Sequence, residues 1–204
     1  MQVVCAGASS ERARRLSEQL VAEGVQALLS FGIAGGLSPD LDCGELIVAE
    51  SLQGTEGTNY PTDATWRAAL TAALTEVTLP YRQGVLLDSP RTLREAADKQ
   101  AAYRDSACLA VDMESGAVAA VAAEAGLPFL AVRAVADCAT DRLPDFVASA
   151  VKPDGKPAIG RVLAALARHP GDLPATLRLA RQTELALARL RMLDSVREVL
   201  LGRF

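Results

Sequence analysis

A chain of 204 residues, half of them hydrophobic and only 4% aromatic, is long enough to bury a core built mainly from Ala, Val and Leu. No apolar run approaches the ~20 residues that span a membrane, and the segment after Met1 does not resemble a signal peptide. With a formal net charge of −4, the composition predicts one domain over residues 1–204, located in the cytoplasm.

Strands and helices are predicted to alternate along the first two thirds of the chain. Residues 2–6 are expected to form a buried strand, followed by a helix that Ser9 or Ser10 caps and that ends before Gly24. Residues 25–31 are expected to form the next strand, completing a βαβ unit. Further strands are predicted at 44–52, 82–89, 108–111 and 128–136, and further helices at 63–77, 92–105 and 113–126.

This alternation favours an α/β fold with three layers, α/β/α, around a central mixed and largely parallel sheet. We expect the α/β core at 1–150 and a helical C-terminal extension at 157–201, separated by a helix at 145–151 and a loop at 152–157.

Charge is distributed unevenly along the chain. Residues 1–159 carry 13 basic and 21 acidic side chains, a net charge of −8, whereas residues 160–204 carry eight arginines and four acids, a net charge of +4. The arginines of the tail alternate with leucines, which fits a helix on an anionic membrane or on an acidic protein surface. The alternative is a helix that packs on its own domain.

The sulfur and imidazole side chains suggest no familiar catalytic machinery. The four cysteines form no C-x-x-C pair and are far apart in sequence, so we predict neither a zinc site nor a disulfide framework and interpret them as small buried hydrophobic residues: Cys5, Cys43, Cys108 and Cys138. His169 is the single histidine and lies at an expected helix end, which excludes the usual Ser-His-Asp and Cys-His arrangements. Acid–base chemistry would therefore depend on carboxylates.

Two such carboxylates follow predicted strands: Glu114 comes after strand 108–111 and Asp137 after strand 128–136. The glycine-rich segment "FGIAGG" follows the strand at 25–31. Because ligands in open α/β sheets bind outside the carboxyl ends of the strands, we expect these three strand ends to form one rim. The alternatives are that Glu114 complements a helix dipole and that Asp137 caps the next element.

The glycine segment lacks the motifs of ATP-binding and NAD-binding loops. Its glycines instead allow the backbone to approach a flat ligand closely, although an ordinary turn would use them as well.

At these residues the chain resembles a known family. The segments "FGIAGGLSPDLDCGELIVAE" and "AVDMESGAVAAVAAEAGLPFLAVRAVAD" are similar to the glycine loop and to the ribose and base segment of the nucleoside phosphorylase and nucleosidase superfamily. That superfamily includes purine nucleoside phosphorylases and methylthioadenosine/S-adenosylhomocysteine nucleosidases. The resemblance runs from about Val3 to Thr140. Residues 151–182 also resemble the C-terminal region of the hopanoid-biosynthesis-associated branch, whose expected reaction removes adenine from adenosylhopane.

The resemblance implies cleavage of an N-glycosidic bond. Asp137 would act as the general acid at purine N7, which requires burial to raise its pKa from about 3.9. Glu114 would accept hydrogen bonds from the ribose 2′- and 3′-hydroxyls. The other expected substrate contacts are Met113 under the sugar, the residues Ile33, Ala34 and Gly35 of the glycine segment, and Leu93 at the position of the family's stacking aromatic. Arg133 is expected to pair with an acid rather than to touch the substrate.

The resemblance also leaves alternatives open. Ile33 stands where the phosphorylases have a serine and Ser30 where the bacterial ones have an arginine, so phosphorolysis and hydrolysis both stay possible. Inorganic phosphate is the single co-substrate considered, and no metal or other cofactor is expected. The expected partners are a nucleoside that could be lipid-linked, further copies of the chain, and a membrane surface contacted by residues 171–204; nucleic acid is not expected.

Relatives begin with a strand and a β-hairpin before the strand that residues 2–6 would match. We therefore expect the family's water-activating or phosphate-binding element to be missing here, with Glu56 as a candidate replacement. A non-catalytic nucleoside- or lipid-binding protein is the alternative that follows.

Overall fold

The computed structural model describes residues 2–54, 57–147 and 158–202. Its strands are β1 (Leu28–Gly36), β2 (Leu46–Gln53), β3 (Asn59–Pro61), β4 (Tyr81–Asp88), β5 (Ala110–Asp112) and β6 (Phe129–Asp137). Its α-helices are α1 (Ser10–Ala22), α2 (Ala64–Glu76), α3 (Ala96–Ser106), α4 (Ser115–Ala125), α5 (Ile159–Arg168), α6 (Leu173–Met192) and α7 (Arg197–Leu200), with 3₁₀ turns η3 (Pro170–Asp172) and η4 (Leu193–Val196). No helix in these ranges is both long and apolar enough to span a membrane.

The sheet is mixed and closes on itself. Its order is β3-β2-β4-β5-β1-β6, and β2 also pairs with β6. The pairs β1–β6, β2–β4 and β4–β5 are parallel, whereas β1–β5, β2–β3 and β2–β6 are antiparallel. The predicted α/β class with a central mixed sheet is confirmed, and the closure through β2 and β6 is an addition that the sequence did not indicate.

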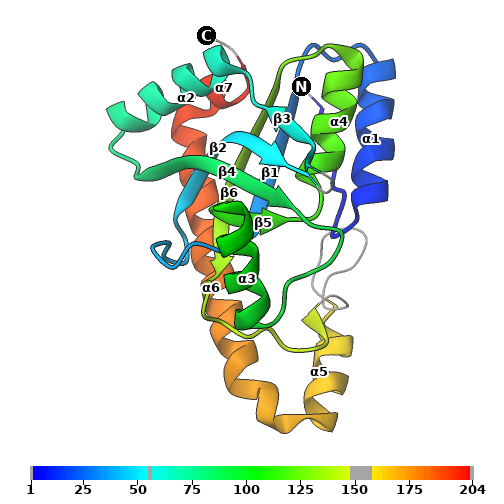
Figure 1. Cartoon of the computed structure of the whole chain (residues 1–204), viewed down its shortest axis with the longest axis vertical. Coiled ribbons are helices and arrows are strands. Elements are labelled where there is room, and N and C mark those ends of the chain that lie inside the picture. Colours follow the sequence, from blue (N-terminus) through cyan, green and yellow to red (C-terminus); the bar gives the residue numbers. More distant parts are fainter. Residues whose placement is uncertain (1, 55–56, 148–157, 203–204) are drawn as a thin grey trace.

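Helices cover the sheet from two sides (Figure 1). β6 is buried along its whole length, and its alternate residues divide the core. Leu130 and Val132 share one face of the strand and pack with α2, α6, η4 and α7. Phe129 and Ala131 alternate with them and pack with α1 and α4 on the other face. A smaller cluster around Leu37, Cys108 and Val111 lies against α3.

Helix boundaries follow the capping residues that the sequence supplies. The Ser9 side chain accepts a hydrogen bond from the Arg12 backbone N–H at 3.3 Å at the start of α1, and Gly24 follows its end with φ of 84°. The Asp63 carboxylate accepts from the Trp66 N–H at 2.7 Å at the start of α2. Both predicted helices are thereby confirmed.

The expected first strand and its βαβ unit are wrong. Residues 2–6 form no strand, and Val3 is 80% exposed. The glycine segment is not a loop either, because β1 continues through Gly36, pairing with β6 from Leu28 to Gly35 and with β5 at Gly35 and Gly36. An apolar run forms a strand only where a neighbouring strand can pair with it. β6 pairs with β1 in this way, whereas residues 2–6 form no strand. The short strand β3 was not predicted.

The C-terminal extension is helical, as predicted, and its second half packs in the core. Buried residues of α6, η4 and α7 contact the sheet and α2: Ala186, Leu190, Leu193, Val196 and Leu200. This part of the basic tail therefore follows the alternative of packing on its own domain. The loop predicted at 152–157, and most of the helix predicted at 145–151, lie outside the described residues.

Candidate active site

Asp137 ends β6 and is buried, with 7% of its surface exposed. A register shift between Ala34 and Gly35 places it opposite Gly35 of β1. A Cβ atom on Gly35 would lie 3.2 Å from Asp137 Oδ2, so the glycine leaves the space beside this carboxyl open. Bulges of this kind often lie next to active sites, where they redirect a side chain.

Lys99 of α3 is the buried partner of Asp137. The Lys99 ammonium donates hydrogen bonds to Asp137 Oδ2, to the Cys138 carbonyl at 2.9 Å and to the Asp141 carbonyl at 3.1 Å, so all three of its donors are used. Burial raises the pKa of Asp137 above its ordinary value, and the positive charge of Lys99 opposes that rise. Sequence reasoning missed Lys99; the available signal was a lysine within an alanine-rich helix expected to pack on the sheet.

Asp141 fixes the segment that follows Asp137. Its carboxylate accepts from the Cys138 backbone N–H at 2.9 Å and from Gln182 of α6 at 2.8 Å, and Arg178 lies 3.5 Å away. Burial alone would raise the pKa of Asp141, but these hydrogen bonds and the charge of Lys99 lower it. Asp141 is therefore ionised at neutral pH and serves as an anchor for the segment.

Glu114 lies at the N-cap position of α4, half-buried, and its side chain makes no capping hydrogen bond. Burial and the nearby negative charge of Asp112 raise its pKa to about 7, although the charge of Arg133 acts in the opposite direction. The alternative role as a simple complement to the helix dipole explains neither the burial nor the missing cap. The side chain is thus held beside other charges, and a backbone hydrogen bond at Met113 offsets part of the rise in its pKa.

Arg133 pairs with an acid, as expected. Its guanidinium donates to Asp112 Oδ2 at 2.5 Å, to Ser115 Oγ at 2.6 Å and to Ser30 Oγ at 2.7 Å, and all four side chains are buried. Ser115 also donates to Asp112. The network joins β1, β5, β6 and the start of α4, and it positions Glu114 because Glu114 lies between Asp112 and Ser115 in the chain.

A third carboxyl group, Asp88, ends β4 directly opposite Asp112 of β5. Its Oδ1 atom is buried and has no hydrogen-bond partner, and a Cβ on Gly116 would overlap its carboxyl carbon at 2.3 Å. Burial and the charge of Asp112 raise the pKa of Asp88. Asp88, Asp112 and Glu114 therefore form an acidic cluster around the start of α4 with Arg133 as its cation.

The predicted rim of three strand ends is corrected by the direction of β5. β1 and β6 run parallel and end together, but β5 runs antiparallel to β1, with Val111 opposite Gly35. The carboxyl end of β5 therefore points back along β1. Asp137 lies at Gly35, while Glu114 lies near Arg133, which is the β6 partner of Gly32 and whose Nη1 would lie 3.4 Å from a Cβ on that glycine. The two acids flank the glycine segment rather than share one rim.

The other predicted substrate contacts are distributed around this segment. Ile33 is 39% exposed and shares a face of β1 with Gly35, whereas the Ala34 side chain points into the core. Met113 is half-buried, and Thr92 Oγ1 donates to its sulfur at 3.4 Å. Leu93 packs in the small cluster beside α3. Glu56 lies outside the described residues.

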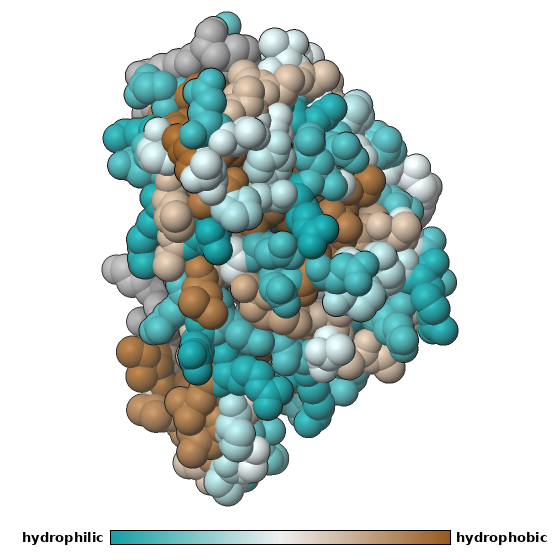
Figure 2. Space-filling view, turned by 90° about the vertical axis from the view of Figure 1, so that its left-hand side faces the viewer, coloured by the Kyte–Doolittle hydropathy of each residue, from teal (hydrophilic) through white to brown (hydrophobic). Residues whose placement is uncertain are grey.

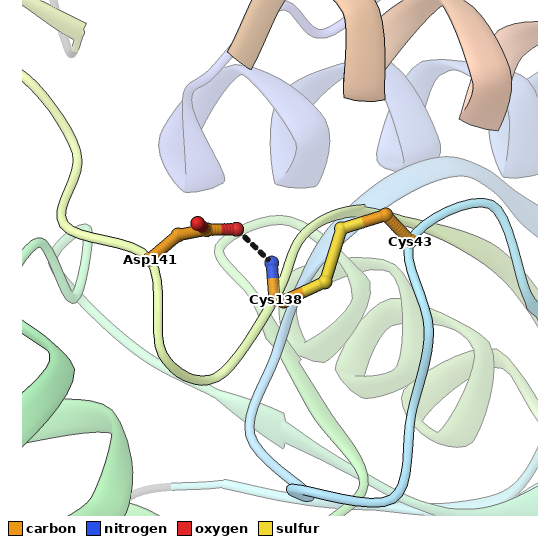
Figure 3. A group of neighbouring side chains, drawn as sticks. All are labelled: Cys43, Cys138 and Asp141. Atoms are coloured by element: carbon orange, nitrogen blue, oxygen red, sulfur yellow. Dashed lines mark hydrogen bonds between the residues drawn. A yellow bond between two sulfur atoms is a disulfide. The ribbon is translucent and has the colours of Figure 1, made fainter. Parts of the chain in front are cut away.

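Three of the four cysteines contradict the sequence interpretation. Cys43, in the loop before β2, forms a disulfide with Cys138, directly after Asp137 (Figure 3). Cys5 is exposed, and Cys108 alone is a small buried hydrophobic residue as predicted. The pairing joins residues 95 positions apart, a separation at which spacing carries no signal. Asp141 lies beside the two sulfur atoms, but a disulfide offers no thiolate to a metal ion.

Residues 2–168 match the sequence model of the phosphorylase superfamily. The chain belongs to this superfamily. No curated protein matches the chain significantly. Among solved structures, the S-adenosylhomocysteine nucleosidase of Streptococcus pyogenes, in complex with 5-methylthiotubericidin, has a TM-score of 0.62 at 24% identity, covering 66% of this chain and 65% of that one.

Two further structures have related folds. The futalosine hydrolase of Helicobacter pylori has a TM-score of 0.61 at 22% identity, covering 65% of this chain and 66% of that chain. The 5′-methylthioadenosine/S-adenosylhomocysteine nucleosidase of Neisseria meningitidis, in complex with methylthio-immucillin-A, has a TM-score of 0.72 at 15% identity, covering 98% and 79%. These likenesses establish the fold. The chain spans just under two thirds of the length of the Streptococcus enzyme.

Proposed function

We propose that this protein cleaves the N-glycosidic bond of an adenine nucleoside and releases adenine. The observation that supports this most directly is the placement of two acids, Asp137 buried and Glu114 half-buried, at opposite ends of the glycine segment of β1. Asp137 lies beside Gly35, and Glu114 lies near the Gly32 end. Three residues of a strand cover about 10 Å, which matches the length of a nucleoside lying along the segment.

In the proposed reaction the C1′–N9 bond breaks as the purine takes up a proton at N7. Asp137 supplies that proton, since burial raises its pKa above the ordinary value and so favours the protonated form. The carboxylate left behind is stabilised by the Lys99 ammonium. Glu114 accepts hydrogen bonds from the ribose hydroxyls, and the sugar cation that develops is captured at C1′ by water or by phosphate.

The finer assignment is an adenine nucleoside with a large apolar substituent, namely adenosylhopane. Two features support it: the resemblance of residues 151–182 to the hopanoid-associated branch, and the partly exposed aliphatic side chain of Ile33 beside Gly35. The named substrates of the structural neighbours favour a smaller thio-substituted adenosine as the second candidate. Comparing adenine release from adenosines with small and large 5′ substituents separates the two.

We also propose that the chain forms a homo-oligomer. Within the described residues, β1 pairs with β5 at Gly35 and Gly36 alone, so its Leu28–Ala34 portion has one unpaired edge. Phe31 on this portion is 45% exposed. Exposed strand edges promote association, and sedimentation equilibrium would reveal a mass above 21.4 kDa.

The decisive experiment measures adenine release by purified protein with and without phosphate. Release that requires phosphate indicates phosphorolysis, and equal release indicates hydrolysis. Asp137→Asn should lower turnover by a factor of about 10²–10⁴ with nucleoside binding largely retained, because the amide keeps the shape and loses the proton. Glu114→Gln should mainly weaken binding, by roughly 1.5–3 kcal/mol per lost charge-assisted hydrogen bond.

One result would reject the enzymatic proposal, and another would reject the role of Asp137 within it. Nucleoside binding without adenine release from any adenosine tested would identify a binding protein. Unchanged turnover in Asp137→Asn would remove this residue from the role of general acid.

A further inference from the structure

One end of the molecule carries exposed apolar side chains on two consecutive helices. α5 exposes Ile159 and Leu163, at 65% and 61%, and α6 exposes Leu173 and Leu177, at 47% and 62%. Within each helix the two residues are four positions apart and therefore lie on the same face. We call residues 158–181 the hairpin tip. Figure 2 shows apolar side chains gathered at the lower end of the molecule, where these helices lie.

The hairpin tip is also basic. It contains four arginines, Arg161, Arg168, Arg178 and Arg181, against one acidic residue, Asp172, which gives a net charge of +3 with His169 neutral. The rest of the chain is acidic, since the total is −4. Apolar side chains and arginines on one short hairpin are the combination found in helices that lie in the membrane interface.

The rest of the C-terminal extension is less suited to such a contact. Its buried apolar side chains on α6, η4 and α7 pack against the sheet and α2, its exposed ones include Leu185, Leu187 and Met192, and residues 182–204 carry four arginines against three acids, a net charge of only +1. We therefore assign the membrane contact expected for residues 171–204 as a whole to the part before Gln182. That part is connected to the candidate site, because Arg178 within it and Gln182 directly after it both contact Asp141, four residues after Asp137.

We propose that the hairpin tip docks on an anionic phospholipid surface. Its four exposed aliphatic side chains would enter the interface between headgroups and acyl chains, and its arginines would bind lipid phosphates. Charge complementarity favours this partner over a second copy of the chain, because pairing two tips would bring arginines against arginines. The inference stands apart from the proposed reaction, since it rests on the surface alone.

The test is sedimentation of the full chain with vesicles of phosphatidylcholine alone or mixed with phosphatidylserine. We expect binding to the anionic vesicles that weakens at high salt, where charges are screened beyond about 3 Å. Leu163→Glu combined with Leu177→Glu should lower the partition coefficient at least tenfold. Arg168→Gln and Arg181→Gln should each lower it about fivefold.

The matched control places two glutamates at apolar positions away from the tip. Val3→Glu combined with Val4→Glu alters side chains that are 80% and 45% exposed. At an ionic strength chosen to offset the change in net charge, this variant should bind vesicles within twofold of the unaltered chain. We expect both double variants to be folded, because the altered side chains are exposed, and thermal unfolding checks this.

Three results would overturn the proposal. The first is no binding to anionic vesicles by the unaltered chain, and the second is equal binding by the Leu163→Glu, Leu177→Glu variant. The third is a dimer, detected by sedimentation equilibrium, that is lost in this variant while vesicle binding is unchanged. That result would identify the tip as an interface between copies.

Discussion

At the scale of single residues, Glu114 should make stability depend on pH. Its pKa is raised from 4.5 to about 7 in the folded chain, so between these values the folded state binds the extra proton. The free energy of unfolding should therefore fall as pH rises through this window. Glu114→Gln should be more stable than the parent by about 2–3 kcal/mol near pH 8, and the difference should vanish near pH 4.5. Urea unfolding at both pH values measures it, and a constant difference would contradict it.

Lys99 should be needed for the stability of the site as well as for its chemistry. Lys99→Met leaves the Asp137 carboxylate buried without its cation, so the free energy of unfolding should fall by about 3–5 kcal/mol at neutral pH. Adding Asp137→Asn removes that isolated charge and should restore a substantial part of the loss. A double-mutant cycle measured by urea unfolding provides the check. Additive effects of the two substitutions would show that the pair is not coupled.

The residues of the site differ in how far the sequence could predict them. Arg133 was expected to pair with an acid because a cation inside an apolar strand needs a partner. Asp137 and Glu114 were identified from their positions after predicted strands and from the family resemblance. Lys99 and the Cys43–Cys138 pair depend on contacts between distant segments, 38 and 95 residues apart, which no local pattern contains.

At the scale of elements, two helical glycines should respond in opposite ways to alanine. Gly116 of α4 lies against Asp88, so Gly116→Ala should destabilise the protein by about 1–3 kcal/mol despite the higher helix propensity of alanine. Gly160 of α5 has open space around it, and Gly160→Ala should stabilise by up to about 1 kcal/mol.

Thermal unfolding of the two alanine variants, with Gly116→Ala/Asp88→Ala as a rescue, tests this contact. Removing the Asp88 carboxyl should recover part of the loss, because it takes away the two atoms that the new methyl group meets at 2.3 Å, while the Cβ of residue 88 stays at 2.8 Å. Equal effects at both glycines would show that α4 has room at Gly116.

Element boundaries were predictable where local chemistry sets them. Ser9 and Asp63 cap α1 and α2 with hydrogen bonds to backbone within three residues, so the sequence contains the full signal. Residues 2–6 have the composition of a strand, but a strand also needs a neighbouring strand to pair with. In the described chain no strand pairs with them, and their sequence contains no sign of this. The reversed direction of β5, which redirects Glu114, likewise depends on the register between distant strands.

At the scale of the whole molecule, closure of the sheet joins the elements that carry the site. β6 contacts β1 on one edge and β2 on the other, so the strand that ends in Asp137 is held from both sides. Gln182 and Arg178 of the C-terminal extension hold the following segment through Asp141. The position of Asp137 thus depends on segments from nearly the full length of the chain.

The Cys43–Cys138 disulfide should accordingly stabilise the molecule as a whole. It closes a loop of 95 residues that contains β2 to β6, and the loss of chain entropy in the unfolded state predicts a contribution of about 4–5 kcal/mol. Cys43→Ser should lower the free energy of unfolding by about that amount, as should reduction of the parent by dithiothreitol. Cys5→Ser is the matched control, because Cys5 is exposed and unpaired with another cysteine, and it should leave the urea midpoint unchanged. If dithiothreitol fails to shift the midpoint of the parent, the two cysteines are not joined in solution, and the segment after Asp137 is held by Lys99 and Asp141 without a covalent link.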